Sequence, residues 1–167
     1  MGKLLGGWTL SAISQLQTGT PLSITTGDDF AGVGPGSGAQ FWIVNGNPKL
    51  SRDKRKFSNS TTDQNYWFAT KNADGTPIFT APPAGTFNTE RVRNFLYGPG
   101  FQNHNLGLYK DFQVKETQKV TFRVEAFNWP NHGNWNNPST DPRSSSFGKV
   151  TTKSSERNLQ FALRYSF

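Results

Sequence analysis

The sequence of 167 residues contains no cysteine and no long hydrophobic run. The lack of cysteine excludes disulfides, a thiol nucleophile and a cysteine-ligated metal. The longest apolar run is the four residues Phe41–Val44, whereas a membrane-spanning helix needs about 20 apolar residues. A helical membrane span is therefore excluded, and the first eight residues have only two consecutive apolar residues, too few for a secretory signal. Either the chain stays in the cytosol, or a targeting signal precedes Met1.

Aliphatic residues are also scarce. The 11 Leu, 7 Val and 4 Ile residues are together fewer than the 14 Phe, 5 Trp and 4 Tyr residues. Charged residues make up 17% of the chain, below the ~25% typical of soluble domains, and 17 Gly and 10 Pro predict many loops. The composition is not that of a highly charged disordered segment, so we expect a folded chain. Its net charge of +7 suits nucleic acid, anionic lipid or an acidic ligand.

The strongest periodic signal is a two-residue alternation of apolar and polar side chains, which is typical of a strand with one apolar face. It is clearest in the range 157–167, where even-numbered positions are polar or small. The odd-numbered positions are apolar or aromatic, namely Leu159, Phe161, Leu163, Tyr165 and Phe167. The same alternation predicts strands over about 101–114 and 119–129, joined by a tight turn, and a first strand over about 7–25.

The ranges 26–100 and 130–156 are rich in Gly, Pro, Asn, Ser and Thr, and we expect long irregular loops there. Compact soluble domains rarely contain such loops. Strands of about 11 residues match the length that crosses a bilayer at a tilt, and a short turn alternating with long loops is typical of outer-membrane barrels.

Nine segments carry a more specific signal when they are taken in order. They are Gly7–Ser11, Gln17–Leu22, Arg93–Asn103, Asn105–Phe112, Phe122–Asn128, Asn131–His132, Asn137–Pro138, Phe147–Val150 and Arg157–Phe167. Together they resemble the C-terminal end of the β-barrel of TonB-dependent outer-membrane transporters of the Oar-like type. The resemblance covers nearly the whole chain, although Tyr97 and Asn105 stand where that family usually has Arg and Asp.

The resemblance implies a barrel of about 22 antiparallel strands around an N-terminal plug, and four strands do not close such a barrel. The expected fold class is therefore all-β, with antiparallel amphipathic strands and long loops, as a C-terminal fragment of a large transmembrane β-barrel in the bacterial outer membrane. Met1 is then a truncated or internal start. The implied partners are the rest of the barrel and the plug, the barrel-assembly machinery, outer-membrane lipid, and TonB only through the missing plug.

The terminal residues Leu159, Phe161, Leu163, Tyr165 and Phe167 resemble the signal that the barrel-assembly machinery reads. The alternative is an ordinary amphipathic terminal strand. If Phe167 lies on the periplasmic side, the loops over 26–100 and 130–156 face outside. On the strands, Arg123, Glu125 and Arg164 occupy polar positions. We expect these three charges to face the barrel lumen, with Arg123 and Glu125 forming a pair.

The loop aromatics Trp129, His132, Trp135 and Phe147 alternate with Asn and Ser. They suit stacking on a sugar, siderophore or peptide, and they equally suit a loop that packs on itself or an interfacial aromatic belt. The sequence identifies no substrate.

A dense basic run follows in the first long loop and consists of Lys49, Arg52, Lys54, Arg55 and Lys56. Nucleic-acid binding is not expected, because no known binding module accompanies the run. Contact with lipopolysaccharide phosphates and a merely solvated loop remain as interpretations.

No catalytic, cofactor or metal site is expected. The glycine-rich stretch Gly32–Gly38 lacks the Gly-Lys-Ser/Thr of a phosphate loop, and His104 and His132 have no metal-ligand spacing. No Ser-His-Asp grouping or carboxylate pair with a suitable arrangement is evident. We therefore expect a protein that is not an enzyme. The competing hypothesis is a soluble β-sheet module that binds carbohydrate or another ligand.

Overall fold

The computed structural model describes residues 6–34, 38–55, 57, 65–90 and 92–167. Within these ranges the regular structure consists of strands and one 3-10 helix, η1 (Arg52–Lys54), and no α-helix occurs. The described residues contain no helix of the length and apolarity that would cross a membrane. The expected all-β fold is confirmed.

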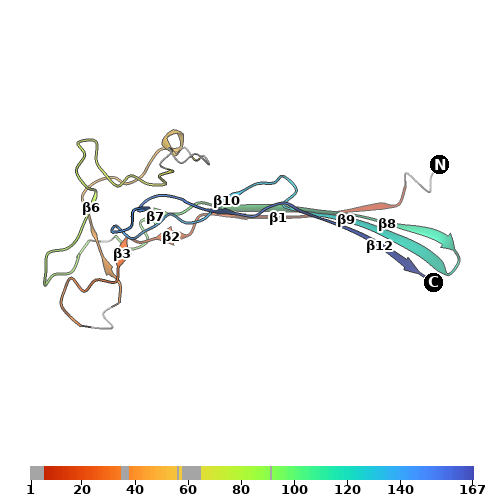
Figure 1. Cartoon of the computed structure of the whole chain (residues 1–167), viewed down its shortest axis with the longest axis horizontal. Helices are drawn as coiled ribbons and strands as arrows, with labels where there is room; N and C mark the ends of the chain where they lie inside the picture. The colour runs from red at the N-terminus through yellow and green to blue at the C-terminus, as the bar shows by residue number, and fades with distance from the viewer. Residues whose placement is uncertain (1–5, 35–37, 56, 58–64, 91) are drawn as a thin grey trace. The chain divides into compact units, whose positions relative to one another are not determined.

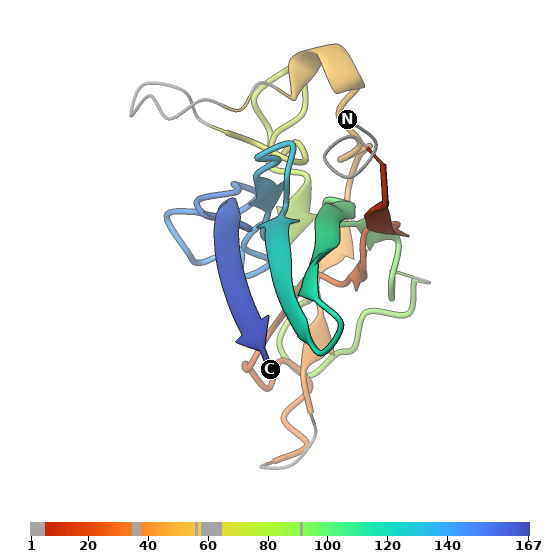
Figure 2. The ribbon, with the colours of Figure 1, turned by 90° about the vertical axis from the view of Figure 1, so that its right-hand side faces the viewer.

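Four long strands form one antiparallel sheet in the order β1-β8-β9-β12 (Figures 1 and 2). They are β1 (Trp8–Gln17), β8 (Phe101–Lys115), β9 (Gln118–Phe127) and β12 (Asn158–Ser166). A tight turn joins β8 to β9. Since Ser166 pairs with Lys119, the chain ends beside this turn, as Figure 2 shows.

Short two-residue strands pair into four small antiparallel sheets. The pairs are β2 (Pro21–Leu22) with β7 (Leu96–Tyr97), β3 (Thr25–Thr26) with β4 (Gln40–Phe41), β5 (Ile43–Val44) with β6 (Phe79–Thr80), and β10 (Asn134–Trp135) with β11 (Lys153–Ser154).

The first strand is shorter than the expected range 7–25, because β1 ends at Gln17. At Gly19 the backbone approaches Gly98 so closely that a Cβ atom would overlap its carbonyl oxygen. The Gly98 N–H also donates to the Thr20 carbonyl at 2.8 Å, and Pro21 and Leu22 then form β2. The expected single strand is therefore wrong beyond Gln17, where a glycine close approach redirects the chain.

The third long strand also ends earlier than the expected range 119–129. Asn128 adopts a φ of 50°, in the left-handed region that Asn tolerates better than most residues. This conformation ends β9 at Phe127 and begins a turn. The other two long strands begin or end within about one residue of the expected ranges 101–114 and 157–167.

The chain divides into two compact units, each described here by itself. The sheet unit comprises Met1–Thr18, Gly100–Asn134 and Lys153–Phe167, and the loop unit comprises Gly19–Pro99 and Trp135–Thr152. The loop unit takes in most of the segments expected to be irregular loops.

The loop unit has a hydrophobic core of its own. Its buried members are Leu22, Ile24, Phe68, Ile78, Phe79 and Leu96. The ring of Phe147 packs against Phe68 and Phe79, with centroids 5.5 and 5.3 Å apart. Edge-to-face packing of this kind stabilises beyond the area that it buries. The long segments between the strands thus pack around a core, because residues far apart in sequence meet there.

Phe68→Ala should unfold the loop unit at lower denaturant, because Phe68 is only 1% exposed. Removing a buried Phe side chain costs about 3–5 kcal/mol. The measurement is limited proteolysis of the detergent-solubilised chain in increasing urea. The control is Phe87→Ala, since Phe87 is 55% exposed and its loss leaves no buried cavity. Equal urea midpoints for the two variants would contradict the proposed core.

Candidate functional site

The register of the four long strands aligns their apolar positions in rows on one face of the sheet. Three rows are Trp8–Lys110–Phe122–Leu163, Leu10–Leu108–Val124–Phe161 and Ala12–Leu106–Ala126–Leu159. Leu10 and Leu163 are 70% and 74% exposed, so protein atoms of the described chain leave this face largely uncovered. Such a continuous apolar face is unfavourable in water and is stable against lipid.

The apolar face becomes polar toward the end of the sheet that lies away from the β8–β9 turn. Ser14 pairs with His104 in the register, and the Ser14 hydroxyl lies 2.9 Å from Nδ1 of His104. Leu16 pairs with Gln102 in the next row on the same face. A change from aliphatic to hydrogen-bonding side chains is expected where a strand leaves the hydrocarbon for the head-group region.

Lys110 interrupts the apolar face with a charge. Its Nζ donates to the Gly6 carbonyl at 2.7 Å and lies 4.9 Å from the ring centroids of both Trp8 and Phe112. A lysine that faces lipid costs ~2–4 kcal/mol at the bilayer midplane. Cation–π contacts and the carbonyl bond offset this cost, and Lys110 is only 4% exposed. The sequence pattern does not reveal Gly6 and Trp8 as partners of Lys110, because both lie far away along the chain.

The opposite face of the sheet carries the polar network, which includes two of the predicted lumen charges. Tyr109 donates its hydroxyl to Glu125 at 3.0 Å, and the Arg123 guanidinium lies 5.0 Å from the Tyr109 ring centroid. The expected direct pair of Arg123 with Glu125 is therefore wrong, because Tyr109 on the neighbouring strand engages both. Its role was not visible in the sequence, since only the β8–β9 register places it opposite Arg123.

Toward the β8–β9 turn, the same face bears a second cluster. Thr121 donates to Asp111, and Lys119 lies 3.4 Å from the same carboxylate. Arg164 pairs with Thr121 in the register and, with Arg123, lines a hollow of about 330 Å³ beside Asp111. The three predicted charges thus all lie on the polar face.

Four of the five predicted terminal residues lie on β12, the strand at one edge of the described sheet. Leu159, Phe161, Leu163 and Tyr165 share the apolar face through their pairing with β9. Phe167 follows the strand, is 93% exposed and lies 6.1 Å from Tyr165 between ring centroids. An edge strand of this kind offers backbone groups for pairing with another strand.

The four predicted loop aromatics divide between the two units. Trp129 is half exposed, and its backbone N–H donates to the His104 carbonyl at 2.9 Å. Trp135 packs against Phe57 at 5.3 Å in the loop unit, where Phe147 is part of the core packing. Phe147 is thus partly buried and agrees with the alternative of a loop that packs on itself, whereas ligand contact by the four residues stays a prediction.

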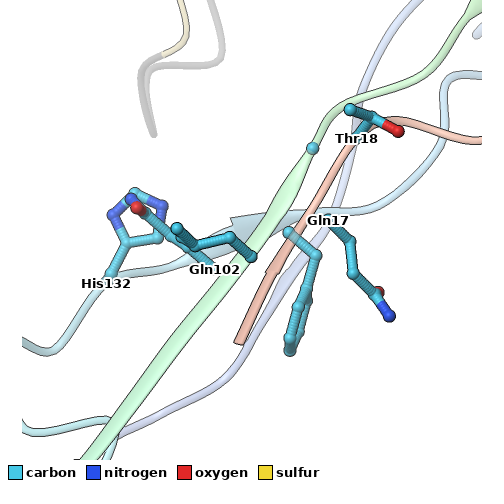
Figure 3. Close-up of a pocket in the computed structure, with 7 residues that line it drawn as sticks. Gln17, Thr18, Gln102 and His132 are labelled. Atoms are coloured by element: carbon cyan, nitrogen blue, oxygen red, sulfur yellow. The ribbon is translucent and has the colours of Figure 1, made fainter. Parts of the chain in front are cut away.

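His132 lines an open groove of about 430 Å³ in the sheet unit. Leu16, Gln17, Thr18, Phe101 and Gln102 are among the other lining residues. Figure 3 shows the side chain of Gln102 on the side of His132, whereas Gln17 extends away from both. The groove thus combines amide, hydroxyl and imidazole groups with two apolar side chains.

Two buried asparagines, which the sequence reasoning missed, shape the turn that carries His132. The Asn128 side chain donates to the His132 carbonyl at 2.9 Å and accepts from its N–H at 3.0 Å. The Asn134 side chain likewise bonds both backbone groups of Gln102, each at 2.8 Å. The three-residue spacing of Asn128, Asn131 and Asn134 could have indicated this turn, because Asn side chains readily form hydrogen bonds to the backbone in turns.

The acidic groups near the glycine-rich stretch have structural partners. Asp29 accepts hydrogen bonds from the N–H groups of Gly34 at 2.7 Å and Val33 at 3.1 Å. The Gly34 bond is the largest of the effects that hold the pKa of Asp29 below its ordinary value. Asp28 pairs with Arg143 at 2.7 Å. The Asp29 carboxylate thus organises the turn that leads to Gly34, and residues 35–37 of the glycine-rich stretch lie outside the described ranges.

The described residues contain no group of three or more His, Cys, Asp or Glu side chains that would hold a metal ion. The features that stand out are a one-sided apolar sheet, a polar opposite face and an aromatic terminal strand. Together they define the class of protein: this sheet is part of the wall of a membrane β-barrel.

The family comparison agrees with this class. Residues 1–160 match the family described as "Outer membrane beta barrel domain", so the chain belongs to this family. Its location is accordingly the bacterial outer membrane. Searches of curated proteins and of solved structures found no match. The family and its location set aside the alternative of a soluble binding module.

Phe161→Arg should weaken folding of the complete protein into lipid vesicles, whereas Gln160→Arg should leave it nearly unchanged. The two positions are adjacent, and Phe161 lies on the apolar face while Gln160 lies on the polar face. A lipid-facing Arg costs ~2–4 kcal/mol near the midplane. The measurement is the urea midpoint of the vesicle-bound protein. Equal midpoints for both variants would show that the faces are wrongly assigned.

Proposed function

We propose that the chain is the C-terminal barrel segment of a TonB-dependent receptor and transporter of the Oar-like type. The proposal is supported by the coincidence of the family-like motifs with the amphipathic strands. The segments Gly7–Ser11, Asn105–Phe112, Phe122–Asn128 and Arg157–Phe167 coincide with parts of β1, β8, β9 and β12. In this proposal the segment contributes strands to the barrel wall and loops at its end, and it has no enzymatic activity and no cofactor.

The proposed partners follow from this role. The rest of the barrel pairs with the strand edges, the plug fills the lumen, outer-membrane lipid covers the apolar face, and TonB acts only through the plug. Nucleic acid is not a partner. With Phe167 at the periplasmic side, the β8–β9 turn is periplasmic too, because Ser166 pairs with Lys119. Trp129 and His132, near the opposite end of β9, are then candidate contacts for an external ligand, with Trp135 in the following loop.

The connection with TonB is tested on the gene and on its complete product. We expect the reading frame to continue upstream of Met1 into further alternating strands and a plug. The purified product should bind the periplasmic domain of TonB in a pull-down, and removal of the plug should abolish this binding. A complete protein without a plug, or one that does not bind TonB, would be an outer-membrane barrel of another kind.

We further propose that the aromatic end of β12 is the assembly signal. The apolar side chains and the free backbone edge suit recognition by strand addition. Deletion of Phe167 should therefore reduce insertion of the complete protein into the outer membrane several-fold, as measured by its folded fraction in isolated membranes. The control is Ser166→Ala, which changes the preceding residue but keeps the terminal aromatic ring. Unchanged insertion after the deletion would refute the signal.

A further inference from the structure

The basic run of the loop unit has no part in the barrel wall. Arg52 and Lys54 lie on η1, and Lys49 and Arg55 flank it, whereas Lys56 lies outside the described residues. Among the described residues, no ion pair involves Lys49, Arg52 or Arg55. These three cations are therefore available to an anion that comes from outside the described chain.

An aromatic wall adjoins these cations. The Arg55 guanidinium lies 4.4 Å from the centroid of Trp67, and the Phe57 ring stacks on Trp67 at 5.6 Å with an interplanar angle of 17°. The Trp67 indole donates its N–H to the Tyr97 carbonyl at 2.7 Å. This bond fixes the plane of the indole, so the guanidinium and the aromatic surface are oriented in advance.

Two cavities meet at Arg55 and Trp67. The smaller, of about 190 Å³, is also lined by Lys49 and Tyr97, and the larger, of about 440 Å³, by Arg52 and Phe57. The Arg55 Nε is buried and has no hydrogen-bond partner among the described residues. An unsatisfied buried donor is costly, and a ligand oxygen would satisfy it. We call Lys49, Arg52, Arg55, Phe57, Trp67 and Tyr97 the basic-aromatic pocket.

We propose that the basic-aromatic pocket binds a small ring that carries a carboxylate or phosphate group. The planar Arg55 fork matches the two oxygens of such a group, and Lys49 or Arg52 adds a second positive charge. The aromatic wall of Phe57 and Trp67, which lines the larger cavity, adjoins the apolar side of the ring. The inference rests on the proposed function for its biological role as a receptor site, whereas the binding itself is independent of TonB.

Isothermal titration of the complete protein in detergent micelles tests the ligand class. The probes are glucuronate, glucose 6-phosphate, neutral glucose and inorganic phosphate. At least one of the two charged sugars should bind at least tenfold more tightly than both glucose and inorganic phosphate. Tighter binding of glucuronate indicates a carboxylate ligand, and tighter binding of glucose 6-phosphate indicates a phosphate ligand. If glucose bound as tightly as the charged sugars, the charge would play no part in binding. If inorganic phosphate bound as tightly as they do, the ring would play no part. Either result overturns the proposal.

Arg55→Gln is the decisive variant, and Lys54→Gln is its matched control. Both remove one positive charge at neighbouring positions, but Lys54 lines neither cavity. Arg55→Gln should weaken binding of the tighter charged sugar at least tenfold, which corresponds to the loss of a charge-assisted hydrogen bond. Lys54→Gln should change it less than twofold. Equal losses in both variants would reveal general attraction to a basic loop and overturn the site.

Arg55→Lys keeps the test valid if Arg55→Gln does not fold. This variant keeps the charge but lacks the planar fork, so it should still weaken binding several-fold. Near-ultraviolet circular dichroism checks that the aromatic packing around Trp67 is intact. Unchanged affinity in a folded Arg55→Lys variant would overturn the bidentate contact. Failure of the pull-down with TonB, by contrast, would refute only the proposed function and leave the pocket in place.

Discussion

A single register of hydrogen bonds joins β1, β8, β9 and β12, and both faces of the sheet depend on it. Because side chains alternate with a period of two, a slip of one residue would turn the apolar side chains of a strand to the opposite face. In the observed register, Leu10, Leu108, Val124 and Phe161 form one continuous row. One side of the sheet therefore suits lipid, and the other can hold charges.

The register also explains how charged residues such as Lys110 are stabilised in the sheet, although Lys110 breaks the alternation of apolar and polar side chains. Lys110 lies in a row with Trp8 and Phe122, so an aromatic ring is available to cover its ammonium group. On the other face, Tyr109 lies opposite Arg123 and reaches Glu125. Lys110 and Tyr109 thus find partners on the neighbouring strands, in addition to the contact of Lys110 with Phe112 on its own strand.

The loop unit follows a different physical rule. Its strands are only two residues long, so few backbone hydrogen bonds join any two of them. Order comes instead from the aromatic packing of Phe68, Phe79 and Phe147 and from side-chain bonds to the backbone, such as that of Trp67 to Tyr97. The scarcity of aliphatic residues is compatible with this core, because large aromatic rings supplement its buried Leu and Ile side chains.

The sequence by itself determined the all-β class, the approximate extent of the long strands and the face on which Phe161, Arg123 or Arg164 lies. These properties follow from two-residue periodicity, which is local. Only the tertiary structure decided that β1 stops before Gly19, that Tyr109 contacts both Arg123 and Glu125, and that Phe147 packs against a core while Arg55 lies over Trp67. Each of these depends on contacts between segments that chain folding brings together, and no local pattern records which distant residue will lie opposite.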